Sequence, residues 1–171
     1  MFETTTLTTP IGPMLAVVSP EGLCGLEFDR PERATRLGAR LARFRAGWET
    51  RPGDPAAFAP VVAWLDAYFD RRWDALDTPV ALDLLGTPFA RDVWNELIRI
   101  APGTTTTYGA IAKTLGRRDG ARAVGAAVGA NPVSLIVPCH RVVGASGSLT
   151  GYGGGLDRKE WLLKHGGALL L

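Results

Sequence analysis

Two side chains able to do nucleophilic chemistry are adjacent in the chain, Cys139 and His140. They follow an apolar run at 133–137, which predicts a buried strand, and Pro138 directly precedes them. A cysteine beside a histidine is typical of an activated thiol, since the imidazole can take the thiol proton. A lone buried cysteine, however, is more often an inert core residue. Because consecutive strand residues point to opposite faces, the two side chains cooperate only if the chain turns here.

The other soft metal ligands are Cys24 and His165, and none of the four has a paired spacing such as C-x₂-C. We therefore expect neither a metal nor a cofactor. Two cysteines cannot build a disulfide framework, which favours a reducing compartment, and we expect the cytoplasm. The 171 residues are 46% hydrophobic and 21% charged, which indicates a folded globular chain. We expect no membrane association, because no apolar run approaches the roughly 18 residues of a span.

The first half of the chain predicts an αβ domain. Runs at 3–8, 14–19 and 22–28 are rich in β-favouring residues and are separated by proline and glycine, which indicates an antiparallel meander. Apolar residues at helical spacing predict helices at 31–45 and 56–70, with a turn at 51–55 between them. The stretch 74–88 reads as extended chain and marks the boundary. We expect one domain over 1–80 and a second over 86–171.

The second half predicts a helix at 89–100 and then two shorter ones. Thr107 is a candidate cap for a helix at 108–115 that ends at Gly116, and Asp119 is a candidate cap for a helix at 120–130. Two short helices joined by a glycine-containing turn are typical of a helix-turn-helix.

Charge also separates the halves. Residues 1–85 hold nine arginines and no lysine against twelve acidic residues, whereas residues 86–171 hold ten basic residues against five acidic ones. A basic excess confined to the second half is compatible with a nucleic-acid face there. An uneven solvated surface is the other interpretation.

The helix at 120–130 has two different faces. One is apolar and suits the core: Ala121, Val124, Ala127 and Val128. The other carries small residues beside one arginine: Arg122, Gly125, Ala126 and Gly129. A glycine inside a helix costs about 1 kcal/mol relative to alanine, so two on one face need a reason. Either a partner such as DNA approaches the helix backbone closely, or another part of the protein packs tightly there; the sequence leaves both open.

Three motifs carry a family resemblance. The runs NPVSLIVPCHRVV at 131–143, GSLTGYGGGL at 147–156 and TTTTYGAIAKTLG at 104–116 resemble the O6-alkylguanine-DNA alkyltransferases, over about residues 86–165. The resemblance implies an α/β (α+β) fold, with an amino-terminal ribonuclease-H-like αβ domain and a carboxy-terminal, mainly helical domain with a helix-turn-helix. It implies a monomer that flips O6-alkylguanine, and also O4-alkylthymine, out of double-stranded DNA through the minor groove. The alkyl group then passes irreversibly to a cysteine of the protein, which acts once; cooperation between copies on DNA stays open.

The resemblance also implies roles for individual residues. Cys139 matches the acceptor thiol, and His140 matches the residue that takes its proton through a water. Asn131 matches the residue that braces the turn around the site, and Tyr108 the hydroxyl that donates to the departing guanine. The remaining matches concern DNA and the base: Arg122 enters the stack in place of the flipped base, on the face that carries Gly125 and Ala126, while Val142, Tyr152 and Gly153 line the base pocket.

One position departs from the family pattern. Relatives usually have a glutamate after the histidine of the last helix, where it orients the catalytic histidine, but here His165 is followed by Gly166. Either another acceptor holds His140, or the thiol is less activated than in relatives. A non-catalytic sensor of alkylated DNA is an alternative function, although such proteins carry tryptophan in place of Cys139. A plain helix-turn-helix regulator would need polar base-reading side chains rather than Gly125 and Ala126.

Overall fold

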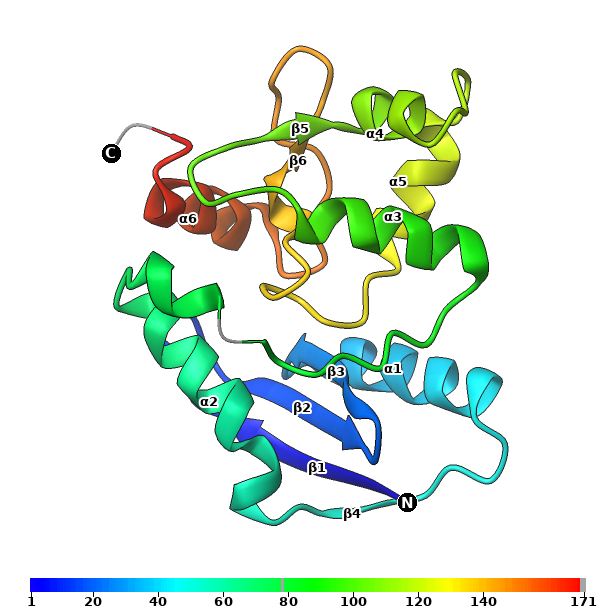
Figure 1. Ribbon diagram of the computed structural model, residues 1–171, viewed down its shortest axis with the longest axis vertical. Coiled ribbons are helices and arrows are strands. Elements are labelled where there is room, and N and C mark those ends of the chain that lie inside the picture. Colours follow the sequence, from blue (N-terminus) through cyan, green and yellow to red (C-terminus); the bar gives the residue numbers. More distant parts are fainter. Residues whose placement is uncertain (78, 170–171) are drawn as a thin grey trace. The chain divides into compact units, whose positions relative to one another are not determined.

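The computed structural model describes residues 1–77 and 79–169 of the chain. These residues form two compact units, Met1–Gly86 and Thr87–Leu171 (Figure 1). The first unit combines a sheet with helices α1 and α2, and the second is mainly helical. The mixed α/β fold class predicted from the sequence is therefore confirmed.

A four-stranded sheet organises the first unit. Strands β1 (Phe2–Leu7), β2 (Met14–Ser19) and β3 (Gly22–Phe28) form the predicted antiparallel meander, and β4 (Thr50–Pro52) runs parallel to β1 at the edge. The bounds of β2 and β3 are those predicted. The turn expected at 51–55 is wrong for its first two residues, because they belong to β4. This strand is short and fully exposed, and it forms through its pairing with β1. Local sequence patterns do not indicate such pairing between distant segments.

The two helices of this unit begin at prolines. Helix α1 spans Pro31–Phe44 and α2 spans Pro55–Phe69, within one residue of prediction at each end. Asp54 caps α2 by accepting the backbone N–H of Ala56 at 2.9 Å. The apolar face of α1 contributes to a core cluster made by Phe2, Val17, Cys24, Leu37, Leu41 and Leu85. Cys24 is thus a small core residue, as its apolar neighbours suggest.

The end of the first unit differs from the extended chain expected at 74–88. Residues Trp73–Asp77 form a 3-10 helix that follows the turn after α2. Later in this stretch, Leu82 pairs with Leu23 of β3 in a single parallel bridge. Thr78, like Leu170 and Leu171 at the carboxyl end, lies outside the described residues.

The second unit contains α3 (Pro88–Ile98), α4 (Tyr108–Thr114), α5 (Ala121–Gly129) and α6 (Leu156–Gly166). Helices α4 and α5 contact each other as the predicted helix-turn-helix, and the Trp94 indole N–H donates to the Ala127 carbonyl at 2.8 Å, which ties α3 to α5. Thr107 caps α4 as predicted, accepting the Ala110 N–H at 3.1 Å. The cap predicted at Asp119 is wrong, because the tight turn makes Gly120 the residue before α5.

The strand predicted at 133–137 is also wrong. These residues form successive turns: the Ile136 N–H donates to the Ser134 carbonyl at 2.9 Å, and Leu135 has a φ of 71°. Extended pairing is interrupted by the prolines on both sides of the segment and by local hydrogen bonds to a side chain. The strands nearby are short ones, β5 (Thr106–Thr107) and β6 (Val142–Val143), which pair in parallel.

Candidate functional site

Asn131 holds the irregular segment that leads to the cysteine. Its side chain is buried, the amide Nδ2 donates to the Val137 carbonyl at 2.8 Å, and Oδ1 accepts the Val133 N–H at 2.9 Å. One side chain therefore joins both ends of the 133–137 turns. Because this asparagine satisfies a buried donor and a buried acceptor, it fixes the path by which the chain reaches Pro138.

The chain then turns sharply at the cysteine. Cys139–Arg141 form a 3-10 turn in which the Arg141 N–H donates to the Pro138 carbonyl at 3.0 Å. Cys139 is 8% exposed and His140 1% exposed. The Arg141 guanidinium anchors the turn by donating to the Ile100 carbonyl at 2.6 Å. The backbone is thus turned at Cys139 and His140 rather than extended, which removes the strand alternation that would have separated their side chains.

A buried lysine lies under this turn. Lys159 of α6 is 0% exposed, and its Nζ donates to the carbonyls of Val142 at 2.6 Å and Thr150 at 2.7 Å. Burial lowers the pKa of Lys159, whereas the nearby Cys139 raises it. No role for this residue was predicted from the sequence. Its signal was its position three and four residues before Leu162 and Leu163, on the side of α6 that is buried.

His140 lies in an environment that opposes its protonation. Burial lowers the pKa of His140 well below its ordinary value, and the nearby charges of Arg141 and Lys159 lower it further. The imidazole is therefore neutral near pH 7. Its ring lies 6.4 Å from that of Tyr152, centroid to centroid, in an edge arrangement.

Gly166 is the last residue of α6. It occupies the position at which the family pattern described above has a glutamate. A methyl group built on it would come within 3.5 Å of the Gly103 nitrogen, an ordinary contact, so the position has space for the start of a side chain. The neighbouring His165 stacks on Trp161 with ring centroids 4.7 Å apart.

Tyr108 is joined to this site through the loop after β6. It is the first residue of α4, and its Oη accepts a hydrogen bond from the Thr150 hydroxyl at 3.2 Å. A methyl group built on Gly125 would lie 3.7 Å from the Tyr108 ring, so α5 passes beside that ring. A continuous set of contacts thus connects Tyr108, through Thr150 and Lys159, to Val142 at the end of the cysteine turn.

The small-residue face of α5 is turned to solvent. Arg122, Ala126 and Gly129 are exposed, whereas Val124, Ala127 and Val128 are buried on the opposite face. A methyl group built on Gly129 would meet no heavy atom of the described chain within 4 Å. Tight packing inside the described part of this unit therefore does not account for Gly129.

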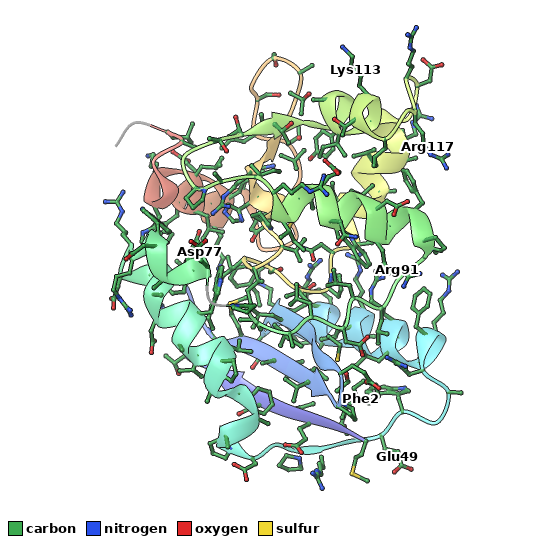
Figure 2. All side chains as sticks on the ribbon, in the orientation of Figure 1. Phe2, Glu49, Asp77, Arg91, Lys113 and Arg117 are labelled. Carbon is green, nitrogen blue, oxygen red and sulfur yellow. The ribbon has the colours of Figure 1, made fainter. Side chains whose placement is uncertain are left out.

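Exposed cations lie on α4, on the turn after it and on α5. We call the four side chains Lys113, Arg117, Arg118 and Arg122 the basic cluster. Figure 2 shows Lys113 and Arg117 extending outward from α4 and the turn that follows it. The Arg117 guanidinium also lies 4.6 Å from the centre of the Phe89 ring, which limits its range of motion. Gly153 is exposed in the glycine-rich loop between β6 and α6, which contributes no residue to the basic cluster.

Within residues 1–77 and 79–169, no three histidine, cysteine or acidic side chains gather closely enough to hold a metal ion. Over the same residues, no helix has the length and apolar character needed to cross a membrane.

Two family descriptions match the chain. The ribonuclease-like domain of 6-O-methylguanine DNA methyltransferase matches residues 3–82, and the DNA binding domain of 6-O-methylguanine DNA methyltransferase matches residues 88–168. One match falls within each unit of the fold.

Individual relatives are similar over nearly the whole chain. The methylated-DNA–protein-cysteine methyltransferase of Salmonella typhimurium is 42% identical over 170 residues, which cover 96% of this chain and 95% of the relative. The methylated-DNA–protein-cysteine methyltransferase of Mycobacterium bovis is 43% identical over 164 residues, covering 96% and 92%. Among solved structures, Mycobacterium tuberculosis OGT in complex with DNA has a TM-score of 0.76 at 40% identity, covering 98% of this chain and 92% of the other.

Proposed function

This chain belongs to the 6-O-methylguanine DNA methyltransferase family, and we propose that it repairs duplex DNA by moving the alkyl group of O6-alkylguanine onto Cys139. O4-alkylthymine is a second proposed substrate. The proposal depends on one observation: Cys139 and His140 are both buried in a 3-10 turn, and Cys139 lies near enough to the Lys159 ammonium to interact with it electrostatically. A non-catalytic sensor would need no nucleophile at this position, so the thiol favours transfer.

In the proposed reaction the Cys139 sulfur attacks the alkyl carbon while the carbon–oxygen bond to guanine breaks. The thiol proton passes through water to His140, and Tyr108 gives its hydroxyl proton to the departing base. The product is a thioether and an unmodified guanine. Since nothing in the proposed chemistry cleaves a thioether, one protein molecule acts once, and we propose that it does so as a monomer.

Ionisation of the thiol supplies only part of the rate. A free cysteine is roughly 3% ionised at pH 7, so complete ionisation gains at most about 30-fold. The Lys159 ammonium favours the thiolate electrostatically, and the neutral His140 is able to accept a proton. Positioning in a closed site and proton donation to the base must therefore supply the larger part. Because the acceptor must remain a reduced thiol, we propose that the reaction takes place in the cytoplasm.

The exposed face of α5 supports a minor-groove approach to DNA. Small residues at Gly125, Ala126 and Gly129 let the helix backbone come close to the groove, and Arg122 is available to fill the gap left by the flipped base. Flipping costs a few kcal/mol, and less for a damaged or mispaired base. In this arrangement Val142, Tyr152 and Gly153 line the pocket that receives the base.

The direct test is incubation with a duplex oligonucleotide containing O6-methylguanine, followed by peptide mass mapping. We expect one methyl group per protein molecule, on the peptide that contains Cys139. Binding of the damaged duplex by a folded protein that gains no methyl group would instead favour the sensor function.

Gly129→Ala is expected to affect stability and DNA binding in opposite directions. Alanine favours the helix, and open space at this position accepts its methyl group, so the free energy of unfolding rises by up to about 1 kcal/mol. Affinity for duplex DNA falls several-fold, because the methyl group holds the helix away from the groove. Chemical denaturation and fluorescence anisotropy measure the two quantities.

Gly38→Ala is the matched control for this prediction. Gly38 lies inside α1 of the first unit, and an added methyl group would make only ordinary contacts of 3.6 and 3.7 Å with Trp48. It should stabilise the fold similarly and leave DNA affinity unchanged. Undiminished DNA affinity in Gly129→Ala would contradict the proposed approach.

Tyr108→Phe is expected to slow methyl transfer by about 10- to 100-fold, because the departing guanine loses its proton donor. DNA binding should change little, since the phenyl ring retains the contact beside Gly125. Single-turnover kinetics at saturating protein, together with a binding titration, separate the two effects. A transfer rate equal to that of the unchanged protein would remove Tyr108 from the mechanism.

A further inference from the structure

Thr150 has no role in the mechanism described so far, yet it contacts the proposed proton donor. Its hydroxyl donates to the Tyr108 Oη at 3.2 Å, across 42 residues of sequence. A tyrosine hydroxyl has one proton to donate and two lone pairs that accept. The bond from Thr150 occupies one lone pair and leaves the phenolic proton available for another acceptor.

The backbone of Thr150 is held independently of its hydroxyl. The Thr150 carbonyl accepts the buried Lys159 Nζ at 2.7 Å, and the same ammonium group donates to Val142 at 2.6 Å. Earlier in the loop, the Gly144 N–H donates to the Ser148 carbonyl at 2.8 Å. The loop between β6 and α6 is therefore closed at its start and anchored at Thr150, so its hydroxyl has a defined location relative to β6.

Tyr108 is constrained from its other side. The residue begins α4 directly after the Thr107 cap, and its ring lies beside Gly125 of α5. Both partners of the Thr150–Tyr108 hydrogen bond thus sit on anchored backbone. This arrangement differs from a chance contact between two mobile surface side chains, in which neither partner is fixed.

We propose that Thr150 is a positioning residue for alkyl transfer, acting through Tyr108. Its hydroxyl directs the Tyr108 O–H away from the loop and toward the departing base. As Tyr108 gives its proton to guanine, negative charge develops on Oη, and the hydrogen bond from Thr150 strengthens. The phenolate then regains a proton from water. This inference rests on the function proposed above, and it assigns Thr150 a contribution made mainly in the transition state.

The test compares Thr150→Val, which keeps the shape and removes the hydroxyl, with Thr150→Ser, which keeps the hydroxyl. Thr150 is exposed, so both variants are expected to fold. In single-turnover transfer from a duplex containing O6-methylguanine, Thr150→Val should be slower by about threefold to tenfold. The reason is that a hydrogen bond to a charged group is stronger than one between neutral groups. Thr150→Ser should recover most of the rate, and the affinity for the duplex should not change.

Two further measurements distinguish this role from a structural one. In a Tyr108→Phe background the Thr150→Val substitution should have no additional effect, because the oxygen through which it acts is gone. Alkylation of Cys139 by iodoacetamide should be equally fast in Thr150→Val and in the unchanged protein, because iodide leaves without a proton. Slower iodoacetamide labelling, or a full additional effect in the Tyr108→Phe background, would overturn the assignment.

The outcome for the unchanged protein separates this inference from the proposed function. If that protein takes a methyl group from DNA and Thr150→Val does so at the same rate, only the role of Thr150 is overturned. If the unchanged protein takes none while iodoacetamide still labels Cys139, the proposed function fails, and the role of Thr150 fails with it.

Discussion

Cys139→Ser is expected to abolish methyl uptake from O6-methylguanine DNA completely. The thiolate is the attacking species, and a serine hydroxyl is a weak nucleophile unless a strong adjacent base activates it. Burial lowers the pKa of His140 and makes it a weak base, which can take the proton of an acidic thiol but not that of a serine hydroxyl. Intact-protein mass spectrometry after incubation with excess damaged duplex measures the loss. DNA binding should persist, since the exposed face of α5 is unchanged.

Cys24→Ser is the matched control, because it removes the other cysteine of the chain. Cys24 is 0% exposed, and burial raises its pKa to about 12, so its thiol is inaccessible and un-ionised. This variant should take up one methyl group, as the unchanged protein does. Methyl uptake by Cys139→Ser, on any residue, would refute Cys139 as the acceptor.

The second large effect is expected at Asn131. Asn131→Ala leaves the Val137 carbonyl and the Val133 N–H without their side-chain partner in a buried segment. Each unsatisfied buried group costs about 1–3 kcal/mol, so the free energy of unfolding of the second unit should fall by several kcal/mol. Because the 133–137 turns lead directly into the cysteine turn, methyl transfer should also slow strongly. Chemical denaturation and single-turnover kinetics report the two losses.

Asn95→Ala provides the comparison for this prediction. Asn95 is the chain's other asparagine and is exposed on α3, where substitution is expected to change stability by no more than about 0.5 kcal/mol. Asn131→Asp keeps the acceptor for Val133 but places a buried carboxylate oxygen against the Val137 carbonyl, so it should destabilise at least as strongly as Asn131→Ala. An Asn131→Ala protein as stable as Asn95→Ala would show that the turns do not depend on this side chain.

Elements with strong local patterns were predictable from the sequence. Strands β2 and β3 have the predicted bounds, and the Thr107 cap of α4 is confirmed, because alternation, punctuation by glycine and proline, and capping chemistry act over a few residues. The same patterns predicted the αβ character of the first half, and the family resemblance implied the mixed fold class.

Features that depend on distant partners were not predictable in this way. The 133–137 segment has the composition of a strand, but Asn131 and the flanking prolines form turns instead. The short β5 and β6 depend on each other, at residues far apart in the chain. Lys159 is buried because two carbonyls from other segments accept its ammonium hydrogens. The roles of Cys139 and its neighbours remain predictions that follow from residue type, family resemblance and this geometry.

The basic cluster on α4, α5 and the turn between them affects how the protein finds damage. Contacts between exposed cations and phosphates carry no sequence information, and each one displaces a condensed counterion. If three of the four side chains neutralise phosphates, affinity falls about 40-fold between 50 and 200 mM salt. The protein would then leave undamaged DNA readily in physiological salt and sample many positions in turn. The time it spends at each position would then depend on how easily the base there can be flipped out of the duplex, and not on the surrounding sequence.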